Sequence, residues 1–579
     1  MTKKNFQEIT DIKEEKKNIL NDEIIDRLIP DTGYDVDVLE KKYHERNIPV
    51  GARVTRISPS PTGSMHIGGT YTAFISERIA HSTNGGIFYL RIEDTDQKRE
   101  QHGTREMIMM SLHKFGINYD EGDMEDGSVI GEYGPYTQSK RAQIYKTYVK
   151  GMLKNGLAYP CFMTNDEQEQ MRAQQTKQSV KTGYYGTWAI WRNAKQEEVV
   201  TELDSGKPFV VRYRSDGNPN QRIIVNDLIR GRLELPEDNN DIVLLKSDGL
   251  PTYHFAHIID DHLMRTTTVI RGDEWLSSLP LHVQLSKVLG FKPFEYGHLS
   301  TIQKIDENGS RRKLSKRKDP EASVEYYFSH GYPVEAVKDY LMNIANPGFE
   351  MWRKENPDKT YIEYEFSIEK IPSTGGGLLD LTKLNDVSKE FIGEMSADEI
   401  VTRSIAWSKE FDIQLYEILT SDVEYAKKVF SIERGESAIK KRKDIAYFSQ
   451  IKDQYGLFFK KYFDEMVFGK EVIEKISSFN KDDIKNIIDS FIDTYNETDN
   501  NAIWFDKVKV ISEKLGYTTN LKEYRKNPEK FKGSVIDVAN ILRAAITKRF
   551  QSPDLCDIMK TIGKDETMVR LASAIKLLG

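Results

Sequence analysis

The sequence predicts an α/β nucleotide-binding fold in the first half of the chain and an all-α fold in the second half. One observation is a strand, loop, helix and strand pattern over residues 54–90. Another is that amphipathic helical patterns, without continuous β patterning, follow Lys318. A parallel sheet with covering helices therefore precedes a helical region.

The composition is that of an ordinary globular chain. Its 579 residues predict about four domains, and 38% hydrophobic with 30% charged residues is typical of soluble proteins. No apolar run is long enough to span a membrane. Residues 1–18 are polar and contain no signal-peptide core. We therefore expect a cytoplasmic protein without membrane contact.

The cysteine content excludes a cysteine-rich zinc site, whereas the net charge excludes no class of partner. The two cysteines, Cys161 and Cys556, cannot form a cysteine-rich zinc site, and a disulfide is not expected in a reducing cytoplasm. The net charge of −7 does not by itself predict nucleic-acid binding. An RNA-binding enzyme needs a local basic face rather than a basic total.

Residues 1–50 predict a helical extension. Hydrophobic residues recur at roughly helical spacing up to Ile29, Pro30 ends that run, and residues 34–43 fit a second short helix. Packing against the body of the protein is the expected role. Binding of a partner or RNA is the alternative for such amphipathic helices.

Residues 54–90 form the unit on which the first half is organised. Val54 and Ile57 indicate a short buried strand, and two prolines with a glycine then force a turn. A helix opens at His66 and is expected to end at Gly85–Gly86, before a second strand over residues 87–90. This is a βαβ unit of the nucleotide-binding kind.

The start of this helix suggests that the chain handles ATP. Gly68 and Gly69 let phosphates approach the backbone, and the N–H groups of a helix start point at anions. His66 can donate a hydrogen bond to a phosphate oxygen as charge develops. The alternative is that His66 only caps the helix or packs there.

The region between residues 157 and 245 separates two halves of the nucleotide fold. It follows helices over residues 104–115 and 136–153, and it contains strand-like pieces at 209–213 and 242–245. It also interleaves basic and aromatic residues, which suit single-stranded RNA ends. An aromatic core with solvated charges is the alternative. The residues are Arg172, Lys177, Lys181, Tyr184, Tyr185, Trp188, Trp191 and Arg192.

The returning half contains a candidate carboxylate site. Tyr253 and His257 are four residues apart in an expected helix and share a face. Residues 269–271 form a short strand that ends in Arg271, and a substrate carboxylate needs such a cation. A surface ion pair is the alternative for Arg271.

A basic segment follows the turn at residues 306–309. Lys313 and Lys316 flank Ser315 in an expected mobile loop, where they suit a triphosphate and a leaving pyrophosphate. A solvated basic loop is the alternative.

The second half reads as helices separated by turns such as residues 375–377. A basic cluster at residues 440–443 suits either phosphates or a solvated helix face. The expected helices cover residues 326–328, 334–344, 391–405, 482–495, 504–515 and 535–550.

The motifs around His66 and Lys316 together resemble the two signatures of class I aminoacyl-tRNA synthetases. The surrounding segments resemble glutamyl-tRNA synthetase, densely before residue 330 and more thinly after it. They are residues 56–63, 90–96, 251–256, 260–264, 270–277, 313–317, 541–547 and 552–553.

The resemblance implies a class I Rossmann-type catalytic domain with an inserted α+β domain that binds the tRNA acceptor end. An all-α anticodon-binding region of the bacterial type follows. The implied parts are an extension at 1–50, catalytic halves at 51–155 and 246–300, the insertion at 156–245, a lysine-loop and stem-contact region at 301–400, and the anticodon domain at 401–579.

The implied activity is ATP-dependent attachment of L-glutamate to the 3′ end of tRNA-Glu through glutamyl-adenylate, with release of AMP and diphosphate. Mg²⁺ is expected to accompany ATP, and a monomer is the family expectation. Some relatives carry a Cys-x-Cys zinc element where this chain has Cys161-Phe162-Met163, so no zinc is expected.

The resemblance also assigns residues. Those implied in catalysis and ATP binding are His66, Gly68, Gly69, Lys313, Ser315 and Lys316, with His66, Lys313 and Lys316 catalytic. Those implied in glutamate binding are Arg56, Ser60, Glu93, Tyr253, His257 and Arg271. Those implied at the tRNA acceptor end are Thr95, Asp96 and Arg99. Many relatives have Asn where this chain has His257, which leaves the details of glutamate binding open.

Several alternatives remain. A glutaminyl enzyme typically opens with Pro-Glu-Pro-Asn-Gly where this chain has residues 59–63, and a non-discriminating enzyme would also charge tRNA-Gln with glutamate. A truncated relative that modifies a tRNA base would be shorter. A non-catalytic RNA-binding paralogue would not need His66, Lys313 and Lys316. A nucleotidyltransferase that does not use tRNA would not need the helical second half.

Overall fold

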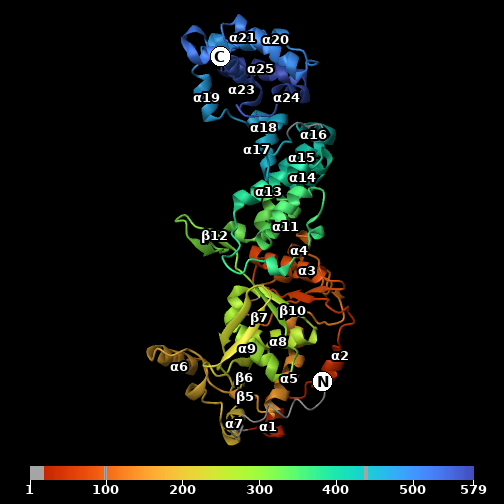
Figure 1. Cartoon of the computed structure of the whole chain (residues 1–579), viewed down its shortest axis with the longest axis vertical. Helices are drawn as coiled ribbons and strands as arrows, with labels where there is room; N and C mark the ends of the chain where they lie inside the picture. The colour runs from red at the N-terminus through yellow and green to blue at the C-terminus, as the bar shows by residue number, and fades with distance from the viewer. Residues whose placement is uncertain (1–18, 97, 100, 436–440, 579) are drawn as a thin grey trace. The chain divides into compact units, whose positions relative to one another are not determined.

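The computed structural model describes residues 19–96, 98–99, 101–435 and 441–578. The chain divides into two compact units (Figure 1). The first comprises Met1–Tyr326 and Lys338–Asp380, and the second comprises Tyr327–Val337 and Leu381–Gly579.

Buried parallel strands form the centre of the first unit. β1 (Val54–Ile57) pairs with β2 (Ile87–Leu90), and β10 (Thr268–Gly272) pairs with β11 (Glu295–Leu299). β10 lies beside β1, because the Thr267 N–H donates to the Val54 carbonyl at 3.0 Å. The carboxyl ends of β1, β2 and β10 therefore lie close together, where ligands bind in open α/β sheets.

The predicted βαβ unit is confirmed. α3 (Ile67–His81) connects β1 to β2 and packs its apolar face against them. The helix ends at His81, so the expectation that Gly85–Gly86 ends it was wrong. The glycines form the following turn instead. A Cβ on Gly86 would lie 2.0 Å from the Ala80 carbonyl oxygen, so this turn requires glycine.

The remaining elements of the first half include the expected helices near residues 104 and 142. These elements are α1 (Asp22–Leu28), α2 (Val36–Lys42), α4 (Thr104–Lys114), β3 (Gly122–Asp123), β4 (Val129–Ile130) and α5 (Ala142–Lys154). The returning half continues with α8 (Tyr253–Leu263), α9 (Leu279–Val288), β12 (Gln303–Ile305), β13 (Arg311–Lys313), α10 (Val324–His330), α11 (Val334–Ala345) and α12 (Phe349–Glu355).

The intervening region is mixed α and β. β5 (Ala158–Cys161), β6 (Val210–Tyr213) and β9 (Val243–Leu245) form an antiparallel sheet, and two of these strands match the predicted pieces. The hairpin of β7 (Arg222–Asp227) and β8 (Gly231–Pro236) was not predicted, although each strand alternates in exposure. Two helices complete the region, α6 (Asn165–Lys177) and α7 (Gln196–Asp204).

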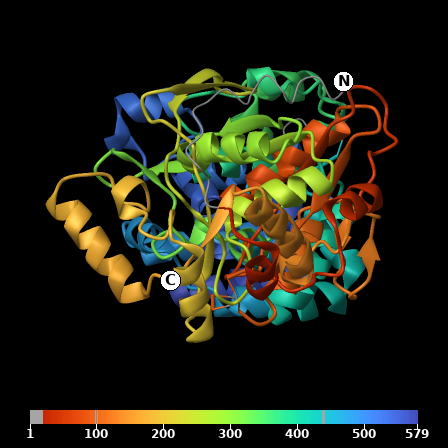
Figure 2. The same cartoon turned by 90° about the horizontal axis from the view of Figure 1, so that it is seen from below.

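The basic and aromatic residues of this region separate into two groups. Tyr184 is 2% exposed and packs near Cys161, while Arg192 pairs with the buried Asp241 at 2.6 Å. These side chains belong to the core. Arg172 and Lys177 are exposed on α6, which projects from the rest of the first unit (Figures 1 and 2).

The described part of the N-terminal extension packs on the first unit, as expected. Ile24, Ile25 and Leu28 of α1 are buried in the same cluster as Tyr145 and Val149 of α5. α2 also packs on α5. Residues 1–18, on which part of the helix prediction rests, lie outside the described residues.

An ion pair of Arg46 links this N-terminal extension to the rest of the first unit. Its Nη1 and Nη2 donate to the two Glu121 oxygens at 2.6 and 2.9 Å, and both side chains are buried. Arg46→Ala leaves a desolvated carboxylate without its cation, so we expect a loss of about 3–5 kcal/mol in the free energy of unfolding of the first unit. Urea unfolding measures this loss in the free energy of unfolding. Arg27→Ala, which removes an exposed pair with Asp204, is the control and should cost under about 1 kcal/mol. Equal losses would contradict the prediction.

The second unit is helical, as predicted, and among the described residues no β-strand follows Lys313. Its α-helices are α13 (Leu381–Glu394), α14 (Ala397–Phe411), α15 (Ile413–Ser421), α16 (Val423–Phe430), α17 (Ile451–Tyr455), α18 (Lys460–Glu465), α19 (Lys470–Ile476), α20 (Lys481–Thr494), α21 (Asn501–Lys514), α22 (Leu521–Lys526), α23 (Val535–Thr547), α24 (Leu555–Ile562) and α25 (Lys564–Leu578).

Two expectations for the second unit were wrong. A single helix over residues 391–405 is interrupted, because Ser396 caps the start of α14 in a capping box with Glu399. In the basic cluster, Arg442 is buried against Asp444 and Tyr455 rather than solvated. Its neighbours Lys441 and Lys443 contact glutamates of α13, and Lys440 lies outside the described residues.

Candidate active site

A cavity of about 810 Å³ opens at the carboxyl ends of β1, β2 and β10. Its size is within the range of sites for small molecules and cofactors. The structure brings thirteen of the candidate residues to its wall. They are Arg56, Ser60, His66, Gly68, Gly69, Glu93, Thr95, Asp96, Arg99, Tyr253, Arg271, Lys313 and Lys316. Ser315 and His257 lie outside this wall.

His66 caps α3, as its alternative interpretation expected, and it also lines the cavity; its hydrogen bond to a phosphate stays a prediction. The Gly68 N–H donates to His66 Nδ1 at 2.9 Å, which leaves the proton of the neutral ring on Nε2. Burial, with the charges of Lys316 and Lys313, lowers the pKa of His66, so the ring is neutral near pH 7. A Cβ on Gly69 would meet only Met65, so the helix start is open to a ligand.

Only the start of the basic segment belongs to a hairpin, and residues 314–318 form the loop and turn that follow it. β12 and β13 pair in antiparallel fashion, and Arg312 holds Asp319 through two hydrogen bonds of 2.6 Å. Asp319 also accepts from the Ser315 N–H at 2.9 Å, which places Ser315 in the turn. This fixed base directs Lys313 and Lys316 to the cavity, where the Lys316 ammonium contacts the Ser64 carbonyl.

Arg271 lines the cavity and has a buried donor without a partner among the described residues. Its Nε donates to His298 Nε2 at 2.9 Å, and its Nη1 lies 3.0 Å from His282 Nδ1. Nη2 is buried and has no hydrogen-bond partner among the described residues. Buried donors are normally satisfied, so this nitrogen indicates a bound acceptor. The surface ion-pair alternative does not apply, because Arg271 is 4% exposed.

Tyr253 and His257 share a face of α8, as predicted, but only Tyr253 reaches the cavity. Their rings stack with centroids 5.8 Å apart, and the Trp275 ring also contacts Tyr253, with centroids 4.3 Å apart. His257 Nδ1 lies 2.7 Å from Asp261, and burial lowers the pKa of His257 to about 3. His257 is therefore a neutral residue behind the wall.

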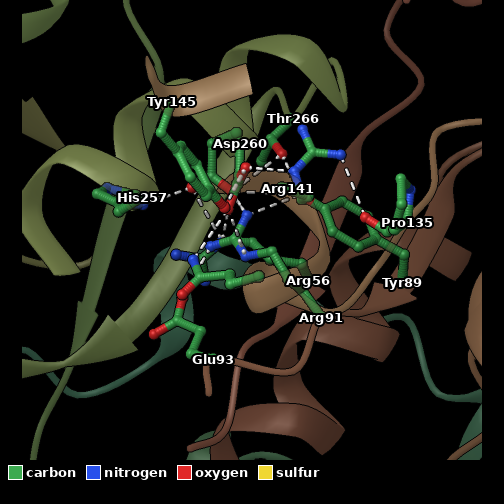
Figure 3. A network of polar contacts seen from close by, with 12 residues as sticks. Arg56, Tyr89, Arg91, Glu93, Pro135, Arg141, Tyr145, His257, Asp260 and Thr266 are labelled. Carbon is green, nitrogen blue, oxygen red and sulfur yellow. Dashed lines mark hydrogen bonds and ion pairs between the residues drawn. The ribbon is translucent and has the colours of Figure 1, made fainter. Parts of the chain in front are cut away.

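A buried network supports the floor of the cavity (Figure 3). Arg91 donates to Asp261 at 2.5 Å and to Glu93 at 3.0 Å, and Arg56 reaches Asp261 at 3.2 Å. Neighbouring Asp260 accepts from Arg141 at 2.7 Å. Charges buried in this way require partners, so the network fixes Arg56 and Glu93 in place.

Sequence reasoning assigned no role to Arg91, Asp260 or Asp261. Their signal is a charge within an apolar segment, such as Arg91 between Leu90 and Ile92. A charge in a buried strand is unusual and indicates a partner or a function.

The candidate acceptor-end residues lie at the cavity wall, where Asp96 and Arg99 are exposed and Thr95 is buried. The Thr95 carbonyl accepts from Lys246 Nζ at 2.8 Å, and Arg99 is exposed with Asp96 at 3.7 Å. Exposed cations at such a position suit a phosphate backbone.

Neither a metal cluster nor a membrane span is found within the described ranges. No group of three or more His, Cys, Asp or Glu side chains there is placed to hold a metal ion. No helix there is long and apolar enough to cross a membrane.

Comparison with protein families gives two matches. The profile of the class I tRNA synthetases for glutamate and glutamine, catalytic domain, matches residues 53–356. The profile of an anticodon binding domain matches residues 422–575. A crystal structure of a glutamate tRNA ligase from Elizabethkingia meningosepticum, in complex with its amino acid, is 27% identical with a TM-score of 0.70. It covers 91% of this chain and 100% of its own.

Curated relatives are more similar in sequence. A glutamate--tRNA ligase from Clostridium perfringens is 45% identical over 531 residues, 92% of this chain and 96% of its own. One from Clostridium beijerinckii is 47% identical over 533 residues, 92% of this chain and 95% of its own. The chain therefore belongs to the glutamate--tRNA ligase family of class I aminoacyl-tRNA synthetases.

Proposed function

We propose that this chain joins L-glutamate to the 3′ end of tRNA-Glu in two steps, with MgATP as co-substrate, and that the cavity is the site of both. The observation that supports this site is the joint presence of an anion-binding helix start, two lysines and a buried arginine with a free nitrogen. We expect a monomer that acts in the cytoplasm, with the domain boundaries given above.

In the first step an oxygen of the glutamate α-carboxylate attacks the α-phosphorus of ATP. A carboxylate–phosphorus bond forms, the bond to the bridging oxygen of the β-phosphate breaks, and pyrophosphate leaves. No protein nucleophile is required, so positioning and charge stabilisation supply the catalysis. His66 Nε2–H and the backbone at Gly68 and Gly69 serve the phosphates. Lys313 and Lys316 neutralise the departing pyrophosphate.

In the second step a hydroxyl of the terminal ribose attacks the activated carbonyl. An ester bond forms, AMP leaves with the bonding electrons of the anhydride, and the hydroxyl proton is released to solvent. Thr95, Asp96 and Arg99 lie where an RNA end can approach the cavity. Mg²⁺ would accompany ATP, held by phosphates and water rather than by a protein cage, and would help to neutralise the phosphate charge.

Glutamate is recognised at both ends in this proposal. Arg271 faces the side-chain carboxylate through its free nitrogen. Glu93, on the floor, suits the α-ammonium group. Tyr253 and Arg56 shape the space between, and Ser60 offers a hydroxyl. Ser315 and His257 act indirectly, Ser315 through the turn after β13 and His257 through its support of Tyr253.

The assay that tests the proposal uses purified protein, ATP, magnesium and labelled glutamate, with tRNA-Glu and tRNA-Gln in parallel. Charging of tRNA-Glu alone indicates a discriminating enzyme, and charging of both indicates a non-discriminating one. If neither is charged and glutamine is attached to tRNA-Gln instead, the proposal is wrong.

Glu93 predicts how glutamate binding depends on pH. Burial raises its pKa to about 7, against the opposing effect of Arg91. The α-ammonium needs the ionised carboxylate, which becomes more populated as pH rises through this value. The KM for glutamate in ATP–pyrophosphate exchange should therefore fall about tenfold from about pH 6 to about pH 8. The KM for ATP, measured in parallel, should stay within about twofold. A flat glutamate KM would contradict this role of Glu93.

A further inference from the structure

We propose that His282 and His298 are positioning residues that hold Arg271 as hydrogen-bond acceptors and so aim its remaining N–H groups at the side-chain carboxylate of the substrate. The inference rests on the proposed function, because it assigns Arg271 to that carboxylate. No role was predicted for either histidine from the sequence.

His298 on β11 connects Arg271 to a fixed carboxylate. Its Nδ1 lies 2.6 Å from Asp227 Oδ2, and both side chains are fully buried. The second oxygen of Asp227 accepts the N–H groups of Ile229 and Arg230 at 3.0 and 2.9 Å. These contacts keep the carboxylate ionised and immobile, and the pKa of Asp227 is lowered. Nδ1 of His298 therefore donates, and Nε2 presents its lone pair to Arg271.

His282 on α9 has the opposite tautomer. A guanidinium has only donors, so Nδ1 of His282 accepts from Arg271 Nη1 at 3.0 Å. The proton of the neutral His282 ring is then on Nε2, which lies 3.0 Å from His254 Nδ1. His254 on α8 is therefore the acceptor that fixes this ring.

The environment keeps both rings neutral. Burial and the charge of Arg271 lower the pKa of His282 and of His298. A second proton on either ring would turn an acceptor into a donor and would place like charges about 3 Å apart.

Neutral partners leave the charge of Arg271 available. In the part of the chain that the structure describes, no carboxylate oxygen lies close enough to an Arg271 nitrogen, within 4.0 Å, to form an ion pair. A direct carboxylate partner would compete with the substrate. The histidines instead occupy Nε and one N–H of Nη1. The N–H groups of Nη2 and the second N–H of Nη1 are then left for the substrate carboxylate. In a glutamine substrate, the side-chain NH₂ group would face one of the Arg271 N–H donors, and two donors cannot form a hydrogen bond with each other.

The test compares His298→Leu with His298→Gln, whose amide oxygen can still accept from Arg271. We expect the leucine variant to raise the KM for glutamate at least tenfold in ATP–pyrophosphate exchange, with the KM for ATP within twofold. Its preference for glutamate over glutamine should fall by a similar factor. His298→Gln should recover most of the glutamate KM and most of the preference for glutamate as substrate. His262→Leu, which removes a histidine that contacts Glu40 instead, is the matched control and should leave the glutamate KM unchanged.

A second measurement does not depend on activity. Side-chain ¹H–¹⁵N spectra of ¹⁵N-histidine protein, assigned with His298→Gln and His282→Gln, should show a protonated Nδ1 in His298 and a protonated Nε2 in His282. Neither ring should titrate near neutral pH. The inference would be overturned if His298 and His282 carried their proton on the same ring nitrogen, or if either ring were charged.

The outcomes separate the inference from the proposed function. If the wild-type protein activates glutamate but His298→Leu leaves its KM unchanged, the positioning role is wrong and the function stands. If the wild-type protein does not activate glutamate, the function itself fails, whatever the spectra show.

Discussion

Lys316→Ala should lower the rate of glutamyl-adenylate formation by about 10²–10³-fold. Negative charge accumulates on the β- and γ-phosphates as the bridging bond breaks, and the Lys316 ammonium is at the cavity wall near the helix start at His66. Its stabilisation grows toward the transition state, so we expect the loss chiefly in the rate and little in the KM for glutamate. ATP–pyrophosphate exchange measures this step without tRNA.

The turn that follows β13 offers a matched control for Lys316. Lys318, two residues along, is exposed and does not line the cavity. Lys318→Ala removes the same charge only two residues away from Lys316. The rate of ATP–pyrophosphate exchange should stay within about twofold of the wild-type rate, because exposed charges are screened. If both variants exchange at the wild-type rate, the segment is the solvated basic loop that was the alternative to an ATP clamp.

The sequence was sufficient for the local elements around the cavity. Strand β1, helix α3 and strand β2 follow from apolar periodicity and from the prolines and glycines that mark the turns between them. Both signals act within a few residues. Many of the candidate site residues came from the resemblance of short motifs, and thirteen of them line one cavity. Their chemical roles stay predictions until the variants are measured.

Long-range partners could not be predicted in the same way. Asp227 and His298 are 71 residues apart and meet only because β7 and β11 are neighbours in the fold. Asp261 contacts Arg56 from 205 residues away. Nothing in the local pattern of either residue indicates its partner. The position of His257 behind Tyr253 likewise depends on packing around α8, whereas helical spacing gives only the shared face.

The break between α13 and α14 was predictable in principle. Ser396 and Glu399 have the spacing of a capping box, in which each side chain accepts from the other's backbone N–H. The apolar periodicity on both sides favoured one continuous helix and obscured this local signal. The burial of Arg442 against Tyr455 had no such signal, since a run of basic residues usually indicates an exposed surface.

Arg271→Met should reduce kcat/KM for glutamate in adenylate formation by roughly 150- to 4,000-fold. Methionine fills a similar volume but has no donor. The side-chain carboxylate would then enter a buried wall without a cation, a loss of about 3–5 kcal/mol for a broken buried pair. Pyrophosphate exchange over a range of glutamate concentrations measures the change. The control is Arg434→Met, which removes a buried arginine of the second unit and should leave glutamate activation within about twofold.

Arg271→Lys separates charge from geometry at the same position. Lysine keeps the cation as a point charge but cannot offer the planar edge of two nitrogens that matches a carboxylate. If the fork is what selects the substrate, the lysine variant should recover less than about a tenth of the lost kcat/KM. Its preference for glutamate over glutamine should also stay low. Full recovery by lysine would mean that the cavity attracts glutamate by charge alone, and the histidines that orient the guanidinium would then have no role in selection.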